Sequence, residues 1–133
     1  MTSEVIYSSG LRTSATHLKS GNSIITDAPT DNHGKGEAFS PTDLVATALA
    51  SCMLTIMGIK ADAKGLDIEG TKAEITKVMA SGPRRIAEAQ VKITMPKHDY
   101  TAADKKLLEQ AARTCPVAQS LHPDLVQAVE FVW

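Results

Sequence analysis

The chain has 133 residues and a mass of 14.2 kDa, which is the size of one domain. Its 14 Lys and Arg residues and 15 Asp and Glu residues give a net charge of −1, so no basic surface for nucleic acid or an anionic membrane is expected. Two cysteines, Cys52 and Cys115, are too few for a disulfide scaffold or a Cys-only zinc site. We therefore expect a single domain over residues 1–133, with no metal and no cofactor.

The N-terminal part predicts short strands followed by a loop. Residues 4–8 and 12–18 are rich in β-branched residues, and Ser9 and Gly10 between them indicate a hairpin turn. A second turn at residues 20–22 precedes another short strand at 23–26. Residues 27–35 are mostly loop formers, and they predict a surface loop rather than a domain boundary because too little chain precedes them.

A long helix is predicted to begin after Ser40. This residue can act as N-cap, Pro41 suits the first helical position, and Asp43 provides an acid in the first turn. The helix should run to about residue 63, with apolar residues on more than one face, which predicts a place in the centre of the molecule. Its apolar stretch, residues 44–59, is shorter than the roughly 20 residues of a spanning helix. With no targeting signal in residues 1–9, we expect a cytoplasmic protein without a membrane segment.

The C-terminal half predicts two strands, a helix and a last strand. Residues 67–80 and 84–95 are strand-like and flank a turn at residues 81–83. A helix should begin at Thr101, be interrupted at Pro116 and continue as a short turn, before a strand at residues 126–132. This order of elements predicts an α+β fold.

Cys52 and Cys115 carry the most reactive side chains of the chain, and they are too far apart in sequence for a C-x-x-C pair. Free cysteines are commonly small buried hydrophobes, and this interpretation stays open. The functional alternative is a dithiol site, in which one thiolate attacks a peroxide oxygen and the resulting sulfenic acid condenses with the second thiol. The attacking thiol then needs a lowered pKa, for which a nearby cation is required. The candidate cations are Arg12, Arg84, Arg85 and Arg113.

Two sequence motifs carry a family resemblance. Residues 34–53, GKGEAFSPTDLVATALASCM, are similar to the first cysteine motif of the OsmC/Ohr family, and residues 114–121, TCPVAQSL, resemble its second, Cys-Pro-Val motif. The order of elements matches over nearly the whole chain. The resemblance implies two antiparallel sheets around a long central helix, in an intertwined homodimer. It also implies a thiol peroxidase for organic hydroperoxides or hydrogen peroxide, recycled by a lipoyl protein or a small dithiol.

Within this resemblance, Cys52 matches the attacking cysteine and Cys115 the resolving one. Family members also use an arginine from the N-terminal sheet, for which Arg12 is the candidate by region. They use a glutamate after the proline of the first motif as well. Here Thr42 stands at that place, so Glu37 and Asp43 are the candidate carboxylates.

We expect an apolar wall beside the attacking cysteine, which favours an organic peroxide. Its candidate residues are Phe39, Leu49, Met53 and Ile56. The missing glutamate favours a second interpretation, a non-peroxidatic OsmC-like dimer that binds a small molecule and whose cysteines are structural or serve another redox chemistry.

Overall fold

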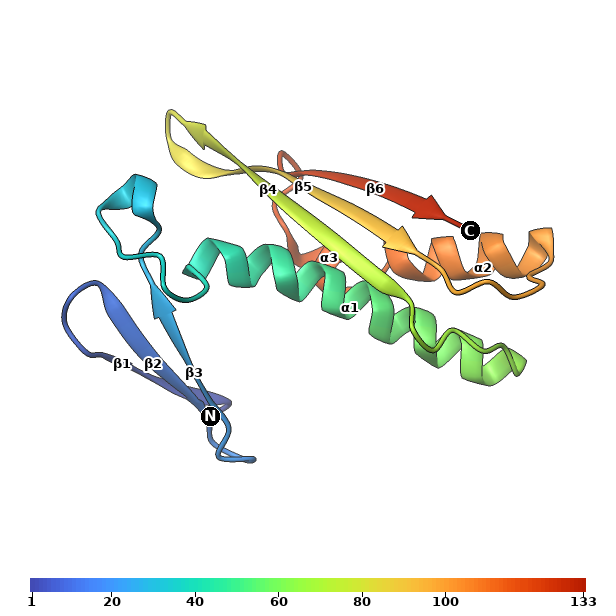
Figure 1. Ribbon diagram of the computed structural model, residues 1–133, viewed down its shortest axis with the longest axis horizontal. Helices are drawn as coiled ribbons and strands as arrows, with labels where there is room; N and C mark the ends of the chain where they lie inside the picture. Colours follow the sequence, from blue (N-terminus) through green and yellow to red (C-terminus); the bar gives the residue numbers. More distant parts are fainter. The chain divides into compact units, whose positions relative to one another are not determined.

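Six strands and three α-helices follow one another in the order that the sequence predicts. The computed structural model describes residues 1–133, which form two units, Met1–Val45 and Ala46–Trp133 (Figure 1). The α+β class is confirmed. Each unit contains a three-stranded sheet, and in the sequence the long helix α1 lies between the two sheets.

The first unit contains a meander of three antiparallel strands, β1 (Ser3–Tyr7), β2 (Arg12–His17) and β3 (Ser23–Asp27). The turn between β1 and β2 has left-handed backbone at three successive residues, of which only Gly10 adopts it without steric cost. The predicted hairpin is confirmed. A short 3-10 helix, η1 (Thr30–Asn32), interrupts the loop that follows β3.

Helix α1 runs over Pro41–Lys64 and begins with the predicted cap. The Asp43 backbone N–H donates to Ser40 Oγ at 3.1 Å, and the Ser40 N–H donates to Asp43 Oδ2 at 2.9 Å. These reciprocal bonds satisfy donors that the first turn of a helix leaves free. At the other end, Gly65 is left-handed, and the Leu66 N–H closes the last turn on the Ala61 carbonyl.

The predicted long central helix is confirmed, although in a single chain only one face of α1 is fully buried. Its fully buried residues recur at helical spacing and form one stripe, while Val45 and Ile59 are 37% and 58% exposed. By length and composition, α1 could also cross a membrane, since it has 24 residues and an 18-residue window within it reaches a mean hydropathy of 1.8. The core helix of a soluble protein passes the same test. The buried stripe comprises Ala46, Leu49, Ala50, Met53, Met57 and Ala61.

The second unit contains β4 (Lys72–Ser81), β5 (Arg84–Thr94) and β6 (Val126–Val132), in the order β4-β5-β6. The expected antiparallel arrangement holds only for β4 and β5, whereas β6 lies parallel to β5 and makes the sheet mixed. The chain passes through α2 (Ala102–Arg113) and α3 (Pro116–Ser120) between these two strands, and such a helical crossover returns the chain in the same direction.

The helices cover one face of this sheet and enclose the core (Figure 1). The core side chains come from all layers: Leu49, Met53 and Met57 from α1, Val91 and Ile93 from β5, and Leu108 and Ala112 from α2. Phe131 of β6 and Trp133, which follows the strand, both contact α2: Trp133 Nε1 donates to Glu109, and the Arg113 guanidinium lies 5.3 Å from the Phe131 ring centre. The face of β6 that carries these residues is therefore the one turned to the helices.

Candidate functional site

Cys115 lies at the junction of α2 and α3. It is the N-cap of α3, and its Sγ accepts a hydrogen bond from the Ala118 N–H at 3.4 Å. Pro116 at the first helical position lacks the N–H that would continue α2, so the chain turns here and starts a new helix. The Cys115 side chain is fully buried.

Cys52 approaches Cys115 from α1. Its side chain is half-buried, packs against the same core and lies within hydrogen-bonding reach of the Cys115 thiol. Both cysteines are free thiols. The structure therefore brings together two sulfur atoms that are far apart in sequence, one partly open to solvent and one closed off.

The surroundings of Cys115 keep it protonated. Burial raises the pKa of the Cys115 thiol above its ordinary value, and the neighbouring Cys52 raises it further. The backbone N–H groups of Val117 and Ala118 act against this rise without cancelling it. A buried, protonated thiol is a poor first nucleophile, so an incoming electrophile meets Cys52 first.

The raised pKa of Cys115 makes stability depend on pH. The unfolded thiol ionises near pH 8.5 and the folded one at higher pH, so this contribution is complete below about pH 8.5 and is lost as the pH rises through the folded pKa. We expect the free-energy difference in unfolding between the parent and Cys115→Ala to narrow above pH 8.5, by at most about 1.4 kcal/mol per pH unit. Urea unfolding under reducing conditions at several pH values measures it. A difference that stays constant to pH 10 would contradict the assignment.

In the first unit, Arg12 forms an ion cluster with two carboxylates. Its Nε lies 2.7 Å from Asp27 Oδ1, and its Nη2 lies 2.8 Å from Asp27 Oδ2 and 3.1 Å from Glu37 Oε2. The bidentate bond from Arg12 lowers the pKa of Asp27 and raises that of the guanidinium. Asp27 is only 2% exposed, so the cluster has one buried and one exposed carboxylate.

Local backbone structure places these charges. Arg12 and Asp27 are directly opposite in the β2–β3 register, and the Glu37 N–H donates to Asp27 Oδ2. The loop returns to Asp27 because Gly34 lies against the Ala28 carbonyl oxygen, which a Cβ on Gly34 would approach to 1.6 Å. Sequence reasoning missed Asp27, although the turn at residues 20–22 fixes which β3 residue faces Arg12.

The remaining predicted site residues lie in the cap of α1, at the surface or in the core. The Asp43 carboxylate takes part in the α1 cap, and the Thr42 hydroxyl lies 3.1 Å from Ser40 Oγ. Phe39 is 56% exposed and Ile56 is half-buried, whereas Leu49 and Met53 are fully buried in the core. Of the other arginines, Arg113 donates to the Val129 carbonyl and Arg85 to the Ile86 carbonyl.

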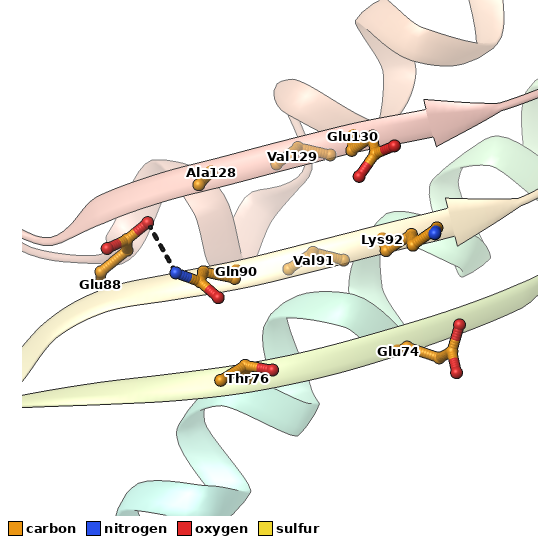
Figure 2. Close-up of a pocket in the computed structure, with 9 residues that line it drawn as sticks. All are labelled: Glu74, Thr76, Glu88, Gln90, Val91, Lys92, Ala128, Val129 and Glu130. Atoms are coloured by element: carbon orange, nitrogen blue, oxygen red, sulfur yellow. Dashed lines mark hydrogen bonds between the residues drawn. The ribbon is translucent and has the colours of Figure 1, made fainter.

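A hollow of about 710 Å³ lies on the other face of the second sheet (Figure 2). Side chains of β5 alternate between the two faces of the sheet. Gln90 and Lys92 are exposed and line the hollow, whereas Val91 and Ile93 are buried on the core side. Figure 2 shows its polar side chains on β4, β5 and β6, with Glu88 bonded to Gln90. The hollow is thus separated from the two cysteines by the sheet. No group of three or more His, Cys, Asp or Glu side chains is arranged to hold a metal ion.

The fold and the paired thiols define an α+β protein with a two-cysteine site. The family model described as OsmC-like protein matches residues 34–129, a range that includes both cysteines, and the chain belongs to this family. The curated proteins compared with the chain give no match.

Solved structures resemble the chain over nearly its whole length. A candidate osmotic stress induced and detoxification response protein from Psychrobacter arcticus 273-4 is 58% identical, with a TM-score of 0.94 over 98% of this chain and 95% of that one. An organic hydroperoxide resistance protein, OsmC, from Legionella pneumophila is 14% identical, with a TM-score of 0.77 over 100% and 98% of the two chains. A candidate organic hydroperoxide resistance protein from Vibrio cholerae, with captopril in one of its active sites, is 15% identical, with a TM-score of 0.76 over 98% and 91%. The last two show the shared fold.

Proposed function

We propose that the protein is a thiol peroxidase that reduces organic hydroperoxides through Cys52 and Cys115. The observation that carries this proposal is the contact between two free thiols from separate helices, of which one is half-buried and the other fully buried. Two structural cysteines would need neither this contact nor this difference in exposure. The hydroperoxide resistance proteins that share the fold support the same reaction class.

The reaction balances with one external dithiol. The Cys52 thiolate attacks the terminal peroxide oxygen, the O–O bond breaks, and the alkoxide takes a proton to leave as an alcohol. Cys52 is now a sulfenic acid. The Cys115 sulfur attacks it, forming a disulfide and releasing water. A lipoyl protein or a small dithiol then reduces the disulfide by thiol–disulfide exchange and is itself oxidised.

Arg12 is our candidate for the cation that supports Cys52. A guanidinium fixed by a bidentate carboxylate is held in one orientation, which suits it to stabilise charge as the peroxide bond breaks. Among the candidate carboxylates, Glu37 contacts Arg12, whereas Asp43 is bonded in the helix cap. We therefore assign to Glu37 the role that the glutamate after the proline has in the family.

The substrate wall is proposed to include Phe39 and Ile56, which are accessible in part, together with Leu49 and Met53, which are buried in the core of the second unit. An alkyl or aryl group favours such surroundings over water, by about 25 cal/mol per Å² of apolar surface buried. This preference would select organic hydroperoxides over hydrogen peroxide.

We expect the active form to be a homodimer in the cytoplasm, with the whole chain as one OsmC-like domain. The first sheet leaves Val5, Ile6, Tyr7, Ile24 and Ile25 each between 46% and 64% exposed, and neighbouring strand residues point to opposite faces. A sheet with apolar residues exposed on both faces needs a covering surface, and a second copy of the chain provides one.

The test is a single oxidation. One equivalent of cumene hydroperoxide added to the reduced protein should give a disulfide between Cys52 and Cys115 within one chain, detected by peptide mass spectrometry as a loss of two hydrogens. With Cys115→Ser, the same treatment should leave a sulfenic acid on Cys52 that dimedone traps. Unoxidised cysteines beside intact peroxide would contradict the proposal.

The second candidate function, a non-peroxidatic OsmC-like dimer that binds a small molecule, is favoured by one feature. Thr42 occupies the place of the family's glutamate, and its hydroxyl lies beside Ser40. Intact peroxide and unoxidised cysteines in the same experiment would support this alternative.

A further inference from the structure

Helix α3 has only five residues, so most of its backbone carbonyls lack partners within the helix. One of them is satisfied from the sheet, because Gln127 Nε2 of β6 donates to the Ala118 carbonyl at 3.0 Å in a part-buried position. The same residue, Ala118, donates its own N–H to Cys115 Sγ at 3.4 Å. A chain of two hydrogen bonds therefore connects Gln127 with the sulfur of Cys115.

Residues before and after Cys115 in the chain are hydrogen-bonded to β6. Before it, the Arg113 guanidinium at the end of α2 donates to the Val129 carbonyl at 3.1 Å. After it, Gln127 binds Ala118. Gln127 lies on the face of β6 that is turned to the helices, opposite the small, buried Ala89 of β5. Its amide thus supplies a hydrogen-bond donor to a carbonyl that the short helix leaves without a partner.

We infer that Gln127 is a positioning residue for the resolving cysteine. By holding the Ala118 peptide, it keeps the first turn of α3 formed, so that the Ala118 N–H remains on Sγ and the sulfur remains beside Cys52. Resolution requires the Cys115 sulfur to attack the Cys52 sulfenic sulfur and displace hydroxide, which takes up the Cys115 thiol proton and leaves as water. The Ala118 N–H stabilises the sulfur while it carries negative charge. This inference rests on the proposed peroxidase function.

The test separates the two chemical steps. Gln127→Met keeps the length of the side chain and removes the donor, and Gln127→Glu replaces the donor by an acceptor. After one equivalent of cumene hydroperoxide, we expect both variants to form the Cys52 sulfenic acid within two-fold of the parent rate, and the disulfide at least ten-fold more slowly. Gln90→Met is the matched control, because Gln90 binds Glu88 on the exposed face of the sheet and has no contact with α3. This control should leave both rates unchanged.

A second readout needs no peroxide. In a Cys52→Ser background, a loosened α3 should expose Cys115, so Gln127→Met and Gln127→Glu should increase its alkylation by iodoacetamide at least ten-fold. Parent-like alkylation, or an equal slowing of both oxidation steps, would overturn the positioning role. If the parent itself forms neither sulfenic acid nor disulfide, the proposed function fails, and the alkylation rates still decide whether Gln127 holds Cys115.

Discussion

Cys52→Ser is expected to consume organic hydroperoxide no faster than buffer with the same dithiol. A serine hydroxyl is not ionised at neutral pH and its oxygen cannot be oxidised to the equivalent of a sulfenic acid, so both requirements of the first step are lost. Cys115→Ser should instead keep the first oxidation step and lose rapid turnover. It keeps the half-buried Cys52 and should consume one equivalent in a burst, followed by slow turnover, because the disulfide that the external dithiol reduces no longer forms.

The matched control for this result is Ser51→Ala. Ser51 is the exposed neighbour of Cys52 on α1, and its substitution should leave peroxide consumption unchanged. Peroxide loss is followed with a ferrous-iron dye assay, and urea unfolding verifies that each variant is folded. If Cys52→Ser consumed peroxide at the parent rate, Cys52 would not be the attacking residue.

The parts of the fold that were predictable from sequence have local causes. The cap at Ser40 and Asp43 and the turn at residues 9–10 depend on neighbours in the chain, and each is present. The approach of Cys52 to Cys115 was expected from the family motifs rather than from spacing. Its structural cause is the packing of α1 and α3 against one core.

The features that sequence reasoning missed are set by tertiary packing. The parallel pairing of β6 depends on the crossover through α2 and α3, and strand periodicity carries no information about direction. The sequence predicts a strand from residue 67, but β4 begins only at Lys72. Residues 68–71 before it form a turn, in which the Thr71 N–H donates to the Ile68 carbonyl. The bond from Gln127 to Ala118 joins a side chain to a backbone group, so no pattern of residue types indicates it.

Leu49→Ala is expected to have the largest effect on stability. Leu49 is fully buried in the centre of the α1 stripe, where α1 packs on the second sheet. Its truncation removes buried apolar surface and leaves a cavity that the surrounding core fills only in part, which costs about 2–5 kcal/mol in the free energy of unfolding. Urea unfolding of the reduced protein measures the loss.

Ile59→Ala provides the comparison on the same helix. Ile59 is 58% exposed, so in a single chain its truncation should cost about 1 kcal/mol or less. In the proposed homodimer the exposed side of α1 is a surface that a second chain can cover, and the cost at Ile59 would then depend on protein concentration. Equal losses at Leu49 and Ile59 that are independent of concentration would contradict the burial pattern of α1. A loss at Ile59 that is small in dilute protein and grows as the protein concentration rises would agree with both the pattern and the dimer.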